Sequence, residues 1–297
     1  MYGPSVAGHL RSESGRAKRR AFSRVRLGRR ELNLWLVACF LANLVAQFIQ
    51  FHSVKAFLFS VGSQNLILWF ACYVAVLRIH QSDAEREASW YDVALVSGIA
   101  ALMLATSIAP HRSALGLLAT AAGLYLLVFA ERDRFLAAAG VVLLALSTNL
   151  VWGPLVFHLF TPTILWADAA LVGTFLTKIR PDIVWIGTQF VAADQHTVQL
   201  VAGCSSFYNV SGALLAWVAV TMLKRTYWRR SDVAAVFLLC AVMVLVNAIR
   251  IGALAWSRES YFLWHESYGV VLLEVTQTAL LGALAFWAAG PRDHNTR

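Results

Sequence analysis

Cys204, Arg250 and His265 are three residues whose side chains could together perform nucleophilic chemistry. Cys204 stands in the polar run at 201–210 that leads into the apolar segment 207–223, so the sequence predicts a thiol at a helix N-terminus. Such an end carries roughly +0.5 of an elementary charge, which favours the thiolate that acts as nucleophile. Arg250 would offer a permanent positive charge and N–H donors to a thiolate or an oxyanion, and His265 would carry a proton to a leaving amine. These residue types therefore predict a cysteine enzyme with a covalent intermediate.

Further polar residues support such a site or offer a structural explanation of it. Asn247 lies one helical turn before the arginine and would orient it, donate to the oxyanion or bind a neighbouring helix. Ser205 and Ser206 would support the site, although a cysteine beside two serines also fits a polar helix cap. Arg250 could equally snorkel to lipid headgroups. His265 could be an ordinary loop residue, and His196 could then be the histidine of the site.

The composition indicates the environment of this chemistry. Apolar residues make up 59% and charged residues 14% of the chain, which is too hydrophobic for a water-soluble globule of 297 residues. Of the four cysteines, Cys39, Cys72 and Cys240 fall within apolar segments, and no Cys/His spacing resembles a metal site. We therefore expect an integral membrane protein with no metal ion and no cofactor.

The predicted fold class is an all-α integral membrane protein with eight transmembrane helices. A disordered basic tail at 1–30 precedes a single polytopic membrane domain at 31–290, with its catalytic part at about 150–280, and a short tail follows at 291–297. The first span is interpreted as an uncleaved signal anchor, because its basic region is long and its apolar run is close to full spanning length. The eight apolar segments are 32–50, 64–79, 92–109, 114–130, 134–150, 207–223, 232–250 and 269–290.

Lysine and arginine are distributed unevenly over the links between these segments. The links that would share one side with both termini hold 19 of the 25 Lys and Arg, nine of them before the first span. By the positive-inside rule, this predicts a multi-pass protein of the cytoplasmic (inner) membrane with both termini in the cytoplasm and the site on the periplasmic face. The net charge of +9 then reflects attraction to anionic lipid rather than to nucleic acid.

The stretch between the fifth and sixth segments is expected to stay on the outer side, because the spans that flank it both have their near ends there. The segment 151–175 looks apolar but contains Asp168 and two prolines, and an Asp in mid-membrane costs about 2.5–3.5 kcal/mol. We expect it to form a re-entrant or interfacial helical element that could occlude the site. Residues 183–201 partly alternate polar and apolar residues around turn-permitting ones, which predicts a short extracytoplasmic β-hairpin before the cysteine.

The run GCSSFYNV around the cysteine, VNAIRIG around the arginine, and a histidine before the last span together resemble the exosortase/archaeosortase family of multi-span cysteine enzymes. The resemblance implies Cys204 as nucleophile, Arg250 as stabiliser of the thiolate and the oxyanion, and His265 as general acid/base. One difference is Ser206, since the family commonly has Cys-Ser-Gly where this chain has Cys-Ser-Ser. A divergent subfamily with another sorting motif would explain it.

The resemblance also implies a substrate. Family substrates are secreted proteins with a C-terminal sorting signal of the PEP-CTERM kind: a short motif, one membrane helix and basic residues. The enzyme would cleave near the motif and pass the new C-terminus to a cell-surface glycan or lipid, or to water. Arg180 and Arg258 could meet an acidic residue of the signal. Two other classes stay open: a transporter with an Arg/Asn-lined anion path, and a non-catalytic partner in envelope assembly.

Overall fold

The membrane domain is largely helical. Among the residues that the computed structural model describes, six helices are long and apolar enough to cross a membrane, and two shorter apolar helices lie at Leu66–His80 and Ser113–Phe129. The chain is therefore a multi-pass membrane protein, and the count of eight crossings stays a prediction. Apart from residues 28–30, the two expected tails lie outside the described residues, which are 28–51, 64–83, 86–108, 112–130, 133–194 and 196–290.

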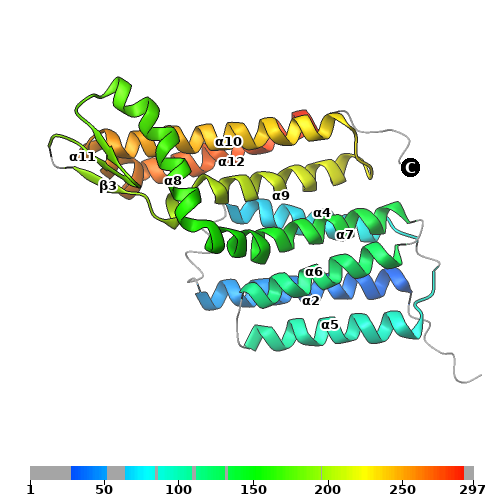
Figure 1. The fold of residues 1–297 in the computed structure, drawn as a ribbon. Coiled ribbons are helices and arrows are strands. Elements are labelled where there is room, and N and C mark those ends of the chain that lie inside the picture. The colour runs from blue at the N-terminus through cyan, green and yellow to red at the C-terminus, as the bar shows by residue number, and fades with distance from the viewer. Residues whose placement is uncertain are drawn as a thin grey trace, which may run out of the picture.

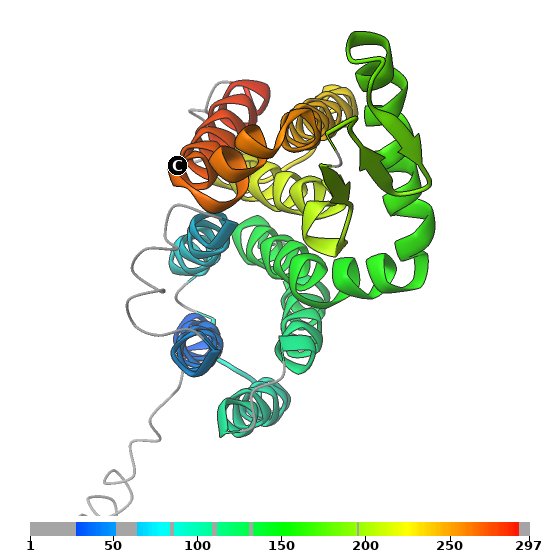
Figure 2. The same ribbon diagram turned by 90° about the vertical axis from the view of Figure 1, so that its left-hand side faces the viewer.

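Eight long helices of the described chain run side by side in a bundle, with α9 near its centre (Figures 1 and 2). Helix α9 packs against α4 and α7 on one side and against α10 and α12 on the other. It therefore joins the N-terminal helices to the C-terminal pair. The helices are α2 (Arg29–Phe51), α4 (Gln64–His80), α5 (Trp90–Ile108), α6 (Arg112–Phe129), α7 (Arg134–Ser147), α9 (Ser206–Lys224), α10 (Ser231–Trp256) and α12 (Tyr268–Ala288).

Helices α6 and α7 show how the sequence sets the packing of this bundle. The carboxylate of Asp133 caps α7 by accepting from the backbone N–H groups of its first turn. Further along, Gly123 and Gly140 face each other, and a Cβ on either would lie 2.8–2.9 Å from the backbone oxygen of the other. Only glycine permits so close an approach of two helix backbones.

The basic ends of several helices gather at one end of the bundle. Arg78 of α4 donates from Nε to the carbonyl of Met222 (2.6 Å) and from Nη2 to that of Leu223 (2.8 Å), which satisfies free carbonyls in the last turn of α9. Lys224 Nζ donates to two carbonyls at the end of α12, at 2.5 and 2.6 Å. The last turns of α4, α9 and α12 are therefore fastened together.

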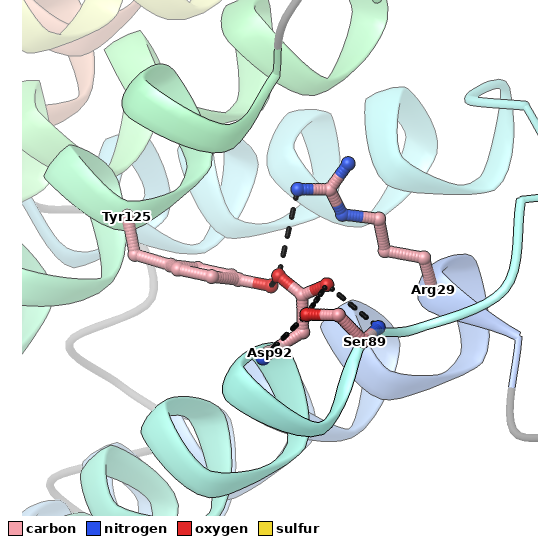
Figure 3. A network of polar contacts seen from close by, with 4 residues as sticks. All are labelled: Arg29, Ser89, Asp92 and Tyr125. Atoms are coloured by element: carbon pink, nitrogen blue, oxygen red, sulfur yellow. Dashed lines mark hydrogen bonds and ion pairs between the residues drawn. The ribbon is translucent and has the colours of Figure 1, made fainter.

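The same end holds a buried polar network around Asp92 of α5 (Figure 3). The Tyr125 hydroxyl of α6 donates to Oδ1 (3.0 Å), the backbone and side chain of Ser89 donate to Oδ2, and Arg29 of α2 lies 3.5 Å from Oδ1. The backbone N–H of Arg29 also donates to the carbonyl of Arg86 (2.9 Å). Charged residues thus tie the first turn of α2 to α5 and α6.

Helix α8 (Gly153–Ile179) follows α7 through the π-turn η2 (Thr148–Trp152) and runs across the opposite end of the bundle (Figure 1). Its backbone leaves helical geometry at Phe160 (φ −116°, ψ 17°), two residues before Pro162. Proline has no N–H to donate and its ring crowds the preceding turn, so a kink is expected there. The helical element predicted at 151–175 is present and continues to residue 179; its depth in a membrane stays a prediction.

Between α8 and α9 lies a small antiparallel sheet with the order β1-β2-β3. The prediction of one hairpin at 183–201 was incomplete, because the chain reverses twice. Gly187 makes the first turn with a φ of +60°, which non-glycine residues rarely adopt, and the chain reverses again between Val191 and Thr197. The strands are β1 (Val184–Ile186), β2 (Gln189–Val191) and β3 (Thr197–Gln199).

The sheet is held between α8 and α10 by a second hydrophobic core. Gly173 of α8 makes room for the ring of Trp185, which would lie 2.5 Å from a Cβ at that position. Buried residues of the sheet, α8 and α10 fill this core together with Cys204. The members are Ala169, Val172, Leu176, Ile183, Phe190, Ala192, Val198, Leu200, Cys204, Ile251 and Ala255.

Candidate active site

Cys204 lies immediately before the N-terminus of α9. A 3₁₀ turn, Ala202–Cys204, ends on it, and Ser205 is the N-cap, whose hydroxyl accepts from the backbone N–H of Phe207 (3.2 Å). Cys204 therefore directly precedes the first turn of α9, as the sequence predicts. The residue is 8% exposed, so a substrate carbonyl must reach it in a largely apolar surrounding.

A buried carboxylate of α8 holds the two serines. Asp168 accepts from the Ser205 hydroxyl (2.9 Å), from the Ser206 backbone N–H (3.0 Å) and from the Ser206 hydroxyl. Ser205 thus caps α9, as in the structural explanation offered for the two serines, and Ser206 is held by the carboxylate of Asp168. The role of Asp168 was missed in the sequence, although an aspartate in an apolar stretch was a signal that it has a partner.

Asn247 connects Cys204 to α10. Its side-chain nitrogen donates to the backbone carbonyl of Cys204 (2.8 Å), and its oxygen accepts from the side chain of Asn209 in α9 (3.0 Å). The residue is fully buried. Because both ends of the amide are used, Asn247 fixes the backbone of the cysteine against α10.

Arg250 lies inside α10 rather than at its end. The predicted end of this segment at the arginine was wrong. Ile251–Trp256 are mostly apolar, and α10 continues through them. The arginine follows Asn247 by one turn, and its neighbour Ile251 belongs to the core that contains Cys204. It is half-buried, and its Nε is buried without a hydrogen-bond partner.

His265 lies in a π-turn, η4 (Phe262–Glu266), between the short helix α11 (Arg258–Tyr261) and α12. Its exposed ring stacks on Tyr261, with ring centroids 4.7 Å apart and an interplanar angle of 14°. His196 lies against the same tyrosine at 5.7 Å, and its Nε2 is 3.0 Å from the backbone oxygen of Leu254. Both candidate histidines therefore stand next to Tyr261, which packs against the core around Cys204.

The two outer arginines differ in their surroundings. Arg180 forms a two-pronged pair with Asp182 (2.8 and 2.6 Å), donates to the carbonyl of Trp256 (3.1 Å) and lies over its indole ring. The hydrogen bond from Arg180 holds the pKa of Asp182 below its usual value, and the same bond raises the pKa of Arg180. Arg258 is exposed at the start of α11 and has no hydrogen bond or ion pair with a described residue.

The three residues with which the sequence analysis began belong to neighbouring elements at one end of the bundle, because α10 packs against α9 and η4. Within the described residues, no hydrogen bond joins the side chains of Cys204, Arg250 and His265 directly. In the part of the chain that the structure describes, no group of three His, Cys, Asp or Glu side chains could hold a metal ion.

Comparison with known proteins assigns the chain to a family. A family model described as transmembrane exosortase (Exosortase_EpsH) matches residues 58–282, which is most of the chain and includes all three residues. The chain belongs to the transmembrane exosortase family. Exosortase membership supports a membrane sorting transpeptidase in general and implies processing of the C-terminal sorting signals of secreted proteins. Searches of curated proteins and of solved structures found no match.

Proposed function

We propose that this exosortase is a cysteine transpeptidase that cleaves C-terminal sorting signals at the outer face of the membrane through a thioester on Cys204. The observation that carries the proposal is the hydrogen bond from Asn247 to the carbonyl of Cys204. Because Asn247 is buried and one turn from Arg250, this bond keeps a cysteine and a permanent cation in adjacent parts of two packed helices. Such a cation stabilises both a thiolate and a developing oxyanion.

The reaction has two balanced steps. Sulfur of Cys204 attacks the scissile carbonyl while His265 takes the thiol proton, and Arg250 faces the oxyanion of the tetrahedral intermediate. The C–N bond then breaks, the leaving amine takes the proton from His265, and the substrate remains as a thioester on Cys204. An amine of the surface acceptor, or water, then attacks the thioester carbonyl, the C–S bond breaks, and the proton of the nucleophile passes through His265 to the sulfur, which restores the Cys204 thiol.

The proposed orientation puts the basic end of the bundle in the cytoplasm. Arg29, Arg78 and Lys224 gather at this end, and cytoplasmic ends of membrane proteins are rich in Lys and Arg. Both termini would then be cytoplasmic, and the sheet and α8 would face the periplasm. We also propose that 31–290 form one membrane domain, with the reaction confined to about 150–280.

Arg258 is the better candidate for contact with the sorting signal. The donors of Arg180 are engaged by Asp182 and by the carbonyl of Trp256, whereas Arg258 is exposed and unpaired among the described residues. An acidic residue in the signal motif would therefore meet Arg258 without breaking a bond that the fold already makes. Arg258→Gln should raise KM for such a substrate more than Arg180→Gln does.

The test is to trap the thioester. A substrate with a sorting signal is incubated with purified enzyme, and hydroxylamine-sensitive label on the protein is located by mass spectrometry. We expect an acyl group on Cys204, and no processing by Cys204→Ala, while Cys240→Ser processes normally. Normal processing by Cys204→Ala would rule out the cysteine mechanism, and no processing by the unchanged protein would favour the transporter or assembly alternatives.

The transporter alternative has less support from the structure. Arg250, Asn247 and Asp168 would line its anion path, but Asn247 and Asp168 are buried and their polar atoms are used in hydrogen bonds to the segment 204–209. Groups that are occupied in this way cannot coordinate a passing anion without loosening the start of α9.

A further inference from the structure

An acidic residue on the last helix has a position that neither the sequence analysis nor the proposed mechanism used. Glu274 lies within α12, one of the helices long and apolar enough to span a membrane. It is exposed, and it has no hydrogen bond or ion pair with any described residue. A carboxylate inside a membrane span normally faces a partner of opposite charge or a polar cavity.

Arg250 and Glu274 are equally many residues away from the link that joins their helices. Helices α10 and α12 pack against each other and are joined at the site end through residues 257–267 (Figure 1). Arg250 lies six residues before Trp256, the end of α10, and Glu274 lies six residues after Tyr268, the start of α12. At 1.5 Å per residue, each is therefore about 9 Å from the connected ends of two neighbouring antiparallel helices.

Each of the two residues is also in line with buried residues of its own helix. Arg250 follows Met243 by seven residues and Leu239 by eleven, and Glu274 precedes Leu281 by seven and Ala285 by eleven. Spacings of seven and eleven are close to two and three turns, so each charged residue stands in line with the two apolar ones of its helix. Those apolar residues are buried in one common core: Leu239, Met243, Leu281 and Ala285.

Unsatisfied polar atoms in the same region point to an unused pairing. Nε of Arg250 is buried and has no hydrogen-bond partner, and Nε2 of Gln277, one turn below Glu274, is in the same condition. Packed helix axes lie 8–10 Å apart, a separation that an arginine and a glutamate can bridge with their long side chains. A lone buried guanidinium N–H and a lone carboxylate both gain from such a pair.

We propose that Glu274 is a positioning residue of the active site, which pairs with Arg250 after a change of side-chain rotamers and directs its guanidinium toward Cys204. The catalytic effect of this orientation rests on the proposed function, whereas the pairing of Glu274 with Arg250 does not. Arg250 projects from a helix interior, where several rotamers are open to it, and a counter-charge on α12 selects one of them. The glutamate then acts on the reaction through the arginine and touches no substrate.

The pairing can be tested without activity. In a chain with Cys39, Cys72, Cys204 and Cys240 replaced by Ala, Arg250→Cys and Glu274→Cys are combined, and a short thiol-specific crosslinker is added in membranes. Trypsin cuts after Arg258 and separates α10 from α12 unless they are linked. We expect linked peptides by mass spectrometry for this pair and none for Ile249→Cys with Glu274→Cys, because Ile249 is 64% exposed on another side of α10. Equal linking of both pairs, or none for the first, would overturn the inference.

The positioning role is tested in the active enzyme. We expect Glu274→Gln to lower turnover by about 100-fold, the loss expected when a catalytic group is displaced by about 1 Å, and Glu274→Asp to restore part of it. Thermal unfolding, and binding of the sorting-signal peptide in a Cys204→Ala background, should not change. Thr276→Val, also exposed on α12, is the matched control.

Turnover equal to that of the control, or a fall in turnover only in step with lost folding or binding, would refute the positioning role. The two proposals can fail separately. If Cys204 proves dispensable while Arg250 and Glu274 still crosslink, the cysteine mechanism fails and the pairing stands. If Cys204 is essential and the crosslink is missing, only the pairing fails.

Discussion

The side-chain amide of Asn247 donates a hydrogen bond to the backbone carbonyl of Cys204 across 2.8 Å, from one membrane helix to the segment that begins another. The same amide accepts from Asn209, so it has no freedom to turn. The position of the cysteine relative to Arg250 therefore depends on one buried side chain.

Removal of this amide should damage both folding and function. Asn247→Ala leaves the carbonyl of Cys204 buried and unpaired, which we expect to cost about 1–3 kcal/mol in the free energy of unfolding and to slow processing. Asn209→Ala is the comparison, because it removes one bond but leaves the carbonyl of Cys204 satisfied. Denaturant unfolding in detergent and cleavage of a reporter substrate measure the two effects, and an equal response of both variants would contradict this account.

Asp168 should be needed for the start of α9. Asp168→Ala leaves three donors of Ser205 and Ser206 without their acceptor, so we expect a lower unfolding temperature and a strong loss of processing. Asp168→Asn keeps one acceptor oxygen, so its unfolding temperature and processing rate should lie between those of Asp168→Ala and of the unchanged chain. Glu259→Gln, at an exposed position, serves as the control for loss of a carboxylate. Unchanged unfolding of Asp168→Ala would show that the cap is dispensable.

The two histidines beside Tyr261 can be separated by mutation. We expect His265→Ala to reduce processing by about 10²–10⁴-fold, the usual contribution of a general acid/base, and His196→Ala to have a much smaller effect. Tyr261→Ala should reproduce part of the His265 loss, because the stacking that orients the ring disappears. Rates are compared at saturating substrate. The opposite ranking of the histidines would transfer the acid/base role to His196.

The pair between Arg180 and Asp182 predicts a pH dependence of stability. The hydrogen bond from Arg180 lowers the pKa of Asp182 in the folded state, so its stabilising contribution is complete above the unfolded value of about 3.9 and is lost as the pH falls through the folded pKa. Asp182→Asn should therefore unfold at a lower temperature than the unchanged chain at pH 7, and the two should converge in stronger acid. A difference that persists or grows in acid would exclude this origin.

Long apolar runs and charged links were enough to predict most helices. Segments such as 64–79 and 207–223 agree within one residue with α4 and α9, because full apolarity and flanking charges mark both ends. The expectation that Cys204 precedes a helix also needed only local sequence, since polar residues there give way abruptly to apolar ones. Family membership was found from the motifs around the cysteine and the arginine.

What the sequence did not disclose depends on contacts between distant segments. The end of α10 was placed at Arg250 because a charge usually marks a boundary, yet a long arginine is tolerated inside a helix when its head reaches a polar region. The partner of Asp168 lies 38 residues further on at Ser206, and no local pattern connects them. The additional strand of the sheet was missed because strands of three residues carry too few alternations to be recognised.

Helix α9 is fixed by hydrogen bonds at the end far from Cys204. Arg78 donates hydrogen bonds to carbonyls of its last turn at the basic end of the bundle. The 19 residues of the helix, about 28 Å, separate these bonds from Cys204. The distance of the Cys204 sulfur from the basic end of the bundle is thus set by the length of α9. In a sorting signal whose membrane helix is lengthened by one turn, the scissile bond would lie about 5 Å beyond the Cys204 sulfur. Processing rates measured for signals of different helix length should therefore show a sharp optimum.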